Sequence, residues 1–167
     1  MKNIITLIVF LLLISNLNAA SLKDIGERGD PNNFDRLVKI EMYDNYYVPS
    51  VIEVKRGETI KFIVTNKGAL VHEYNIGTAQ MHMDHQSEMQ NLIEHEIILA
   101  DKIDKEKMKK MSKEDHSLSH SHHNSIMLEP NEVGELTWKF TKNTVLEIAC
   151  NIPGHYESGM VGKILFD

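Results

Sequence analysis

The chain has 167 residues, enough for one ordinary domain with a real hydrophobic core. Its 18 basic and 24 acidic residues give a net charge of −6, a balance that does not favour nucleic acid or anionic lipid as a partner. The single cysteine, Cys150, excludes an internal disulfide and cannot supply the several thiolates of an iron–sulfur cluster.

The first residues predict export. Lys2 precedes an almost wholly apolar run over residues 4–14, and small residues follow at 19–21. This is the layout of a secretory signal peptide, which we assign to residues 1–20; the alternative is an uncleaved N-terminal anchor. The apolar run, at about ten residues, falls short of the roughly 20 that a membrane span needs. We therefore expect a periplasmic or otherwise secreted protein, without stable membrane insertion after the signal is cleaved.

Seven short strands are predicted in the main domain, which we place at residues 37–167 after an N-terminal extension over 21–36. Apolar and polar residues alternate in these strands, and turn residues such as those at 66–68 separate them. The predicted strands are residues 38–42, 51–54, 59–65, 70–76, 134–140, 145–150 and 161–166. Short strands on both sides of a central insertion favour an antiparallel β-sandwich.

Composition changes sharply in that insertion, residues 80–127, which holds seven of the nine histidines and six of the nine methionines. Apolar residues at helical spacing predict a helix over residues 89–111. The polar, His/Ser-rich stretch that follows, residues 112–125, has the composition of a mobile loop.

One stretch near the C-terminus concentrates metal-binding side chains. Cys150, His155 and Met160 lie on one predicted turn between two strands, and His72 lies in a strand far upstream. Two histidines, one cysteine and one methionine are the ligand set of a blue-copper site, in which thiolate and thioether favour Cu(I) and imidazole suits both oxidation states. Structural zinc sites use more cysteine or histidine and no thioether. Taken singly, each of the four has an ordinary alternative as a buried or hydrogen-bonded core residue.

Three segments, residues 54–60, 71–77 and 150–160, resemble the cupredoxin family, and the nearest likeness is to bacterial plastocyanin/azurin-like periplasmic copper proteins, including copper-tolerance types. The resemblance implies an all-β fold, a Greek-key sandwich, which here carries a partly helical His/Met-rich insertion. It also implies one type 1 copper and a role in electron transfer. The copper ligands that it implies are His72, Cys150, His155 and Met160.

The chain departs from that family at Glu73, because plastocyanin-like and azurin-like proteins often carry Asn after the first histidine ligand. The hydrogen bonds that support the thiolate are therefore expected to differ, so the redox potential does not carry over. The four-residue gaps on either side of His155 also differ from the shorter loops of several relatives.

The insertion offers further copper-compatible donors, since methionine favours Cu(I) and histidine accepts either oxidation state. These side chains either bind additional copper or serve as helix-packing methionines and a solvated polar loop. The candidate secondary ligands are Met81, His82, Met83, His85, Met89, His120, His122 and His123.

Two functions remain open from the sequence. The first is an electron carrier with a role in copper tolerance, whose partner is a redox protein or a copper-handling protein. The alternative is a copper sequestration or delivery protein that uses the insertion and has little electron-carrier role. An enzyme is not expected, because a copper oxidase or reductase needs further copper centres and the sequence shows no substrate-activating group of residues.

Overall fold

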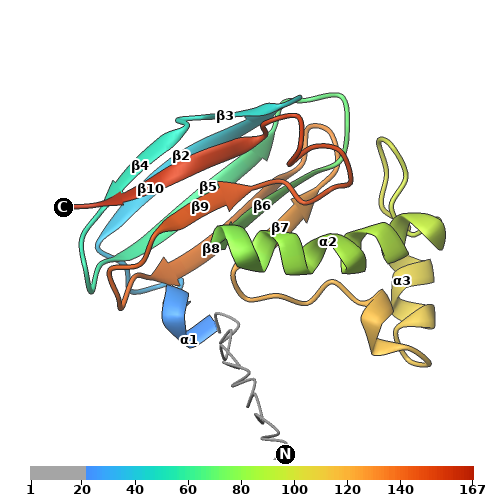
Figure 1. Ribbon diagram of the computed structural model, residues 1–167, viewed down its shortest axis with the longest axis horizontal. Coiled ribbons are helices and arrows are strands. Elements are labelled where there is room, and N and C mark those ends of the chain that lie inside the picture. Colours follow the sequence, from blue (N-terminus) through green and yellow to red (C-terminus); the bar gives the residue numbers. More distant parts are fainter. Residues whose placement is uncertain (1–21) are drawn as a thin grey trace, which may run out of the picture.

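The computed structural model describes residues 22–167, which fold into a sandwich of two five-stranded sheets (Figure 1). The predicted signal peptide lies outside the described residues. The helices are α1 (Leu22–Ile25), α2 (Ala79–Glu94), α3 (Lys105–Met111) and the 3₁₀ helix η1 (His116–Leu118). The strands are β1 (Glu27–Arg28), β2 (Arg36–Tyr43), β3 (Tyr46–Val48), β4 (Val51–Val54), β5 (Thr59–Asn66), β6 (His72–Gly77), β7 (Ser125–Leu128), β8 (Val133–Lys139), β9 (Leu146–Ala149) and β10 (Val161–Phe166). The predicted β-sandwich with a partly helical insertion is confirmed. Within residues 22–167, no helix has both the length and the apolar composition that crossing a bilayer requires.

The two sheets contain both parallel and antiparallel neighbours. The first sheet has the order β1-β8-β5-β2-β3, and the second has the order β4-β10-β9-β6-β7. β5 runs parallel to β2 and β10 runs parallel to β4, so the prediction of an antiparallel sandwich was wrong for these two pairs. The reason is a crossover. After β3 the chain leaves the first sheet, adds β4 to the second, and returns as β5 in the direction in which β2 ran.

The core lies between the sheets and is built by strands whose alternate residues point inward. In β5 the buried positions alternate with partly exposed ones, and Ile60, Phe62 and Val64 are fully buried. The Phe62 ring lies 5.4 Å from the ring of Tyr74 in β6, a contact that joins the two sheets. Because every second side chain of a strand points to the same face, this pattern fixes the register of the sandwich.

β6 is buried along its whole length, because both of its faces are covered. Tyr74 and Ile76 belong to the hydrophobic core. Glu73 and Asn75 point to the opposite face, which the insertion covers. A carboxylate that would face solvent on an ordinary outer strand is therefore enclosed here.

The insertion between β6 and β7 stands beside one end of the sandwich, next to those two strands (Figure 1). α2 begins after Thr78, whose side chain caps the first turn. The helix predicted over residues 89–111 was wrong in its limits, since α2 ends at Glu94 and α3 starts only at Lys105. Between them Glu96 has a φ of 51°, a left-handed conformation that a continuous helix does not contain.

The segment after α3, expected to be a mobile loop, packs against the rest of the domain. Leu118 in η1 is 4 % exposed and belongs to the hydrophobic core. The side chain of His120 is only 5 % exposed. Met89 and Leu92 of α2 are fully buried in the same core. The insertion therefore extends the core of the sandwich.

Candidate metal centre

The fold brings together three of the four predicted primary ligands. The ligand atoms of His72, Cys150 and His155 all lie within 4.8 Å of one another. The Cys150 Sγ lies 3.3 Å from Nδ1 of His155 and 3.9 Å from Nδ1 of His72. The two imidazole rings have their centroids 5.1 Å apart. Two nitrogens thus face one buried sulfur.

Pairing between β6 and β9 explains how residues so distant in sequence meet. Asn75 of β6 is opposite Ala149 of β9, and the strands are antiparallel. The first residue of β6, His72, and the residue after β9, Cys150, consequently lie at the same end of the sheet. Both side chains are fully buried there.

The turn after Cys150 closes back on itself through backbone hydrogen bonds. The His155 N–H donates to the Ile152 carbonyl over 2.9 Å, and the Met160 N–H donates to the His155 carbonyl over 3.0 Å. The Cys150 N–H donates to the Met160 carbonyl over 3.2 Å, and the Met160 side chain is fully buried. Gly154, with a φ of 88°, supplies the left-handed conformation that the turn needs. Met160 is thereby held beside the cysteine and the second histidine.

His72 is oriented by a residue that the sequence did not point to. The Nε2 of His72 lies 2.8 Å from the Asp44 Oδ1. This hydrogen bond holds the pKa of the Asp44 carboxyl below its usual value, so the carboxylate accepts and His72 Nε2–H donates. Nδ1 of His72 is then the nitrogen with a free lone pair, and it faces the sulfur. Burial lowers the pKa of both His72 and His155, which keeps the imidazoles neutral as metal binding requires.

Gly68 leaves room for that orienting pair. A Cβ at this position would lie 2.7 Å from the Nε2 of His72 and would collide with the Oδ1 of Asp44. The sequence identified Gly68 as a turn residue. Its close approach to His72 is visible only in three dimensions.

Burial raises the pKa of the Cys150 thiol to about 12, so the thiol is neutral unless a cation lies beside it. The backbone N–H of Glu73 donates to the Cys150 Sγ over 3.3 Å, which favours the thiolate. The sulfur therefore has a hydrogen bond from the chain although Glu73 stands at the position where the resembling proteins often carry Asn.

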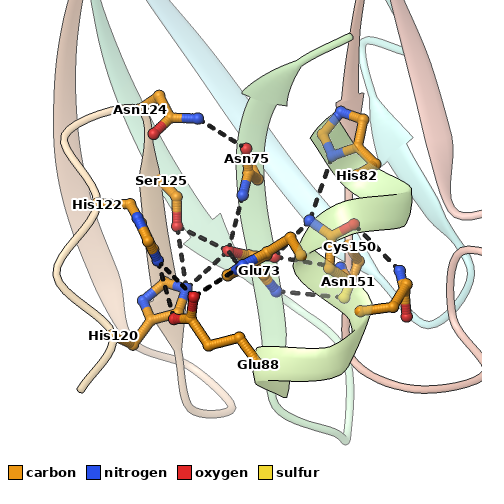
Figure 2. A network of polar contacts seen from close by, with 12 residues as sticks. Glu73, Asn75, His82, Glu88, His120, His122, Asn124, Ser125, Cys150 and Asn151 are labelled. Carbon is orange, nitrogen blue, oxygen red and sulfur yellow. Dashed lines mark hydrogen bonds and ion pairs between the residues drawn. The ribbon is translucent and has the colours of Figure 1, made fainter. Parts of the chain in front are cut away.

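The side chain of Glu73 turns away from the sulfur and is fully buried in a polar network (Figure 2). Its Oε2 accepts from the backbone N–H and the side-chain amide of Asn151, over 3.2 and 2.8 Å. Its Oε1 lies 2.8 Å from Nε2 of His120, 3.2 Å from Nε2 of His85 and 2.7 Å from the hydroxyl of Ser125. Burial acts to raise the pKa of Glu73, but the hydrogen bonds from the two histidines hold it well below its usual range.

A second cluster of histidines lies on the insertion side of Glu73. The ligand atoms of His85, His120 and His122 lie within 4.8 Å of one another. Glu88, one helical turn after His85, contacts His122 over 2.8 Å and His85 over 3.3 Å. The sequence selected these three histidines within a longer set of candidates and did not select Glu88.

The other predicted secondary ligands take separate positions. Met89 is fully buried in the core, whereas Met83 is 54 % exposed. His82 is buried with its Nδ1 3.3 Å from the amide nitrogen of Asn151, and His123 is exposed. Met81 is partly buried and lines a cavity with His85 and His122.

Similarity to known proteins agrees with the fold and with copper as the metal. Residues 4–102 match the model of the cupredoxin-like domain family. The copper-resistant cuproprotein CopI of Pseudomonas aeruginosa is 40 % identical over 77 % of this chain and 75 % of its own length. CopI of Rubrivivax gelatinosus is 31 % identical over 84 % of this chain and 72 % of its own length.

Solved structures of blue-copper proteins share the architecture. Auracyanin B superposes with a TM-score of 0.61 at 14 % identity, covering 85 % of this chain and 96 % of its own. The auracyanin of Roseiflexus castenholzii gives a TM-score of 0.56 at 19 % identity, covering 79 % of this chain and 96 % of its own. At such identities the likeness concerns the fold. Together with the match of more than half of the chain to the family model, it shows that this protein belongs to the cupredoxin-like family.

Proposed function

We propose that the protein is an exported type 1 copper protein that acts in copper tolerance and transfers electrons, with His72, Cys150, His155 and Met160 as its copper ligands. The observation that carries this proposal is the convergence of two neutral imidazoles on one buried cysteine sulfur. Among the residues that the structure describes, no carboxylate or further histidine completes that group, which fits a soft donor set.

Copper in such a site supplies a one-electron change between Cu(I) and Cu(II). The protein's part is to keep the donors in one arrangement. Asp44 fixes the ring of His72, pairing of β6 with β9 fixes Cys150, and the hydrogen-bonded turn fixes His155 and Met160. A site held this rigidly needs little reorganisation when the charge changes, which favours fast electron transfer.

His155 offers the route to a partner. Its side chain is partly exposed and lines a cavity of about 350 Å³. The other walls are mostly apolar and include Leu70, Leu99 and Ile152. An apolar rim around an accessible ligand suits brief contact with a redox protein or a copper-handling protein. Leu99 belongs to the insertion, so the insertion shapes this surface.

The role in tolerance rests on the relatives. The CopI proteins of P. aeruginosa, R. gelatinosus and Vibrio cholerae are each named as copper-resistant cuproproteins. We extend that role to this chain because it is 40 % identical to the first of them. The same relationship supports a non-enzymatic protein that is exported from the cytoplasm, in line with the predicted signal peptide.

A second candidate function is copper sequestration or delivery with little electron transfer. The observation that favours it is the convergence of His85, His120 and His122 within the insertion, apart from the cysteine. The two functions differ in copper stoichiometry and in whether the cysteine site exchanges electrons with a partner.

An optical spectrum of the protein with Cu²⁺ tests the main proposal. We expect an intense blue thiolate-to-copper band that disappears in Cys150→Ser, because a hydroxyl cannot replace the thiolate donor. Ser117→Ala, which changes a hydroxyl of η1, is the matched control and should keep the band. A blue band that survives Cys150→Ser would refute the assignment.

A further inference from the structure

Three histidine rings of the insertion form a nearly equilateral triangle. The ring centroids are 5.4 Å apart for His85 and His120, 4.9 Å for His85 and His122, and 5.1 Å for His120 and His122. Three imidazole nitrogens bound tetrahedrally to one ion at about 2.0–2.1 Å place their ring centroids about 5 Å apart. The triangle has the dimensions of three ligands around a single metal ion.

The sequence and the fold together produce this arrangement. His85 projects from α2, and His120 and His122 follow η1 in an irregular segment that leads into β7. Both histidines of the His-Ser-His run approach α2, since the rings of His120 and His122 lie 5.4 and 4.9 Å from the ring of His85 in that helix.

Two carboxylates complete the cluster. Glu73 contacts His85 and His120, and Glu88 contacts His85 and His122. Carboxylates commonly orient metal-binding imidazoles and raise their basicity. Burial acts to lower the pKa of His85, but its contacts with Glu73 and Glu88 through both ring nitrogens raise it to about 10, so a metal ion must displace a proton there. Once the three imidazoles are deprotonated, they and the two carboxylates carry a charge of −2, which one divalent cation neutralises in a partly enclosed place.

The cluster is enclosed but reachable. The side chains of His85 and His120 are 10 % and 5 % exposed, whereas that of His122 is 35 % exposed. His85 and His122 also line a cavity of about 300 Å³ with Met81 and Asp84 on its walls. An ion therefore has a path to the nitrogens, and the wall near that path carries a further acidic residue.

We propose that His85, His120 and His122 form a second metal site, which binds one Cu²⁺ ion with Glu88 as a neighbouring oxygen donor. Nitrogen and oxygen donors without sulfur suit a divalent ion, and Cu²⁺ is the divalent first-row ion that such donors bind most tightly. This site is separate from the cysteine site and does not depend on the proposed function of the latter.

The test counts metal ions on the full chain. Protein loaded with excess CuSO₄ and desalted should carry two copper ions by mass spectrometry. Cys150→Ser should keep one copper, without the intense blue band and with nitrogen hyperfine splitting from histidines in its electron paramagnetic resonance spectrum. His122→Ala should keep the blue copper alone. The affinity of the histidine cluster for copper should fall more than about 100-fold, since the loss of a residue that only orients a ligand already lowers metal affinity about 10–100-fold.

Two controls protect the test. His116→Ala removes an exposed histidine of η1 outside the cluster and should still carry two copper ions. The blue band of His122→Ala reports whether that variant is folded. His122→Asn, which can still donate a hydrogen bond to Glu88, should also keep the blue copper alone.

One copper in the wild-type protein under excess, or two in His122→Ala, would overturn the proposal. Displacement of the second copper by equimolar Zn²⁺ would overturn the assignment to Cu²⁺. A missing blue band with the second copper present would instead refute the cysteine site alone.

Discussion

The backbone N–H of Glu73 donates a hydrogen bond to the Sγ of Cys150 over 3.3 Å. The carboxylate of the same glutamate accepts hydrogen bonds from His85 and His120 of the insertion, of which Figure 2 labels His120. One residue of β6 thus contacts the cysteine site with its main chain and the histidine cluster with its side chain. A substitution at Glu73 should therefore change the contacts with the histidines and leave the backbone hydrogen bond to Cys150 in place.

Glu73→Gln should lower the stability of the metal-free protein while the blue band persists. The amide keeps the shape but loses the charge that pairs with His85 and His120, and hydrogen bonds to charged groups contribute about 1.5–3 kcal/mol each. Chemical denaturation measures the loss of stability. We expect a smaller loss for Glu88→Gln, because the Glu88 side chain is 23 % exposed. Equal stability of Glu73→Gln and the wild-type protein, or loss of the blue band, would contradict this account.

Met160→Leu should keep the blue band and raise the reduction potential. Although thioethers as a class favour Cu(I), a weak axial donor adds electron density that Cu(II) needs more than Cu(I) does, and leucine offers no donor. We expect a rise on the order of 59 mV. For a one-electron couple this corresponds to a tenfold change in the relative affinity of the site for Cu(I) over Cu(II). Protein-film voltammetry measures the shift. A fall in potential would show that Met160 is not the axial donor.

Gly68→Ala should weaken copper binding at the cysteine site about 10–100-fold, because the new methyl group breaks the hydrogen bond from His72 to Asp44. Asp44→Ala should have a similar effect by removing the acceptor. If both act on one hydrogen bond, the double variant should be no weaker than the worse single variant. Competition with a chelator measures the affinities, and additive losses would refute the shared cause.

Removal of copper should leave the protein folded, because the core between the sheets is formed by residues such as Ile60, Phe62 and Tyr74. Copper at 100 times its dissociation constant adds about 2.7 kcal/mol by mass action. For a domain of this size that raises the melting temperature by roughly 5–10 °C. Calorimetry of both forms checks the shift. A metal-free chain without a cooperative transition would contradict the prediction.

Deletion of residues 80–125 should destabilise the domain. A change in the length of a surface connection has by itself only a small entropic cost. This deletion also removes Met89, Leu92 and Ile97, which are fully buried in the common core. Circular dichroism should show loss of cooperative unfolding in the deletion variant, whereas His122→Ala should retain it.

The sequence alone selected His72, Cys150 and His155, whose ligand atoms the fold brings within 4.8 Å of one another, because histidine, cysteine and methionine, with such different chemistry, seldom occur in this spacing. That they bind copper together with Met160 stays a prediction. The sequence predicted the longer strands for a similar reason, since β5 and β8 show several alternations. β1 and β3 have two and three residues, too few to show a pattern. β7 is as long as β4, but Ile126 is its one β-branched residue, so its composition did not indicate a strand. Asp44 was missed because a turn residue carries no sign of the histidine that it will contact.

The histidine cluster was predicted only as part of a longer set. Periodicity gave no reason to separate His85 from Met83, or His122 from His123. The distinction depends on where α2 begins after Thr78 and on how the segment before β7 packs against it. Those contacts are tertiary, and only the fold supplies them.

The order of donors along the chain has a consequence for assembly. A polypeptide emerges from the ribosome, and enters an export channel, with its N-terminus first. His85, His120 and His122 precede Cys150, and β10 follows the turn that carries His155 and Met160. A partly emerged chain therefore presents the imidazoles of the insertion before any thiol. The cysteine site is complete only after the turn with His155 and Met160 has emerged, and β10, which pairs with β4 and β9, comes directly after that turn.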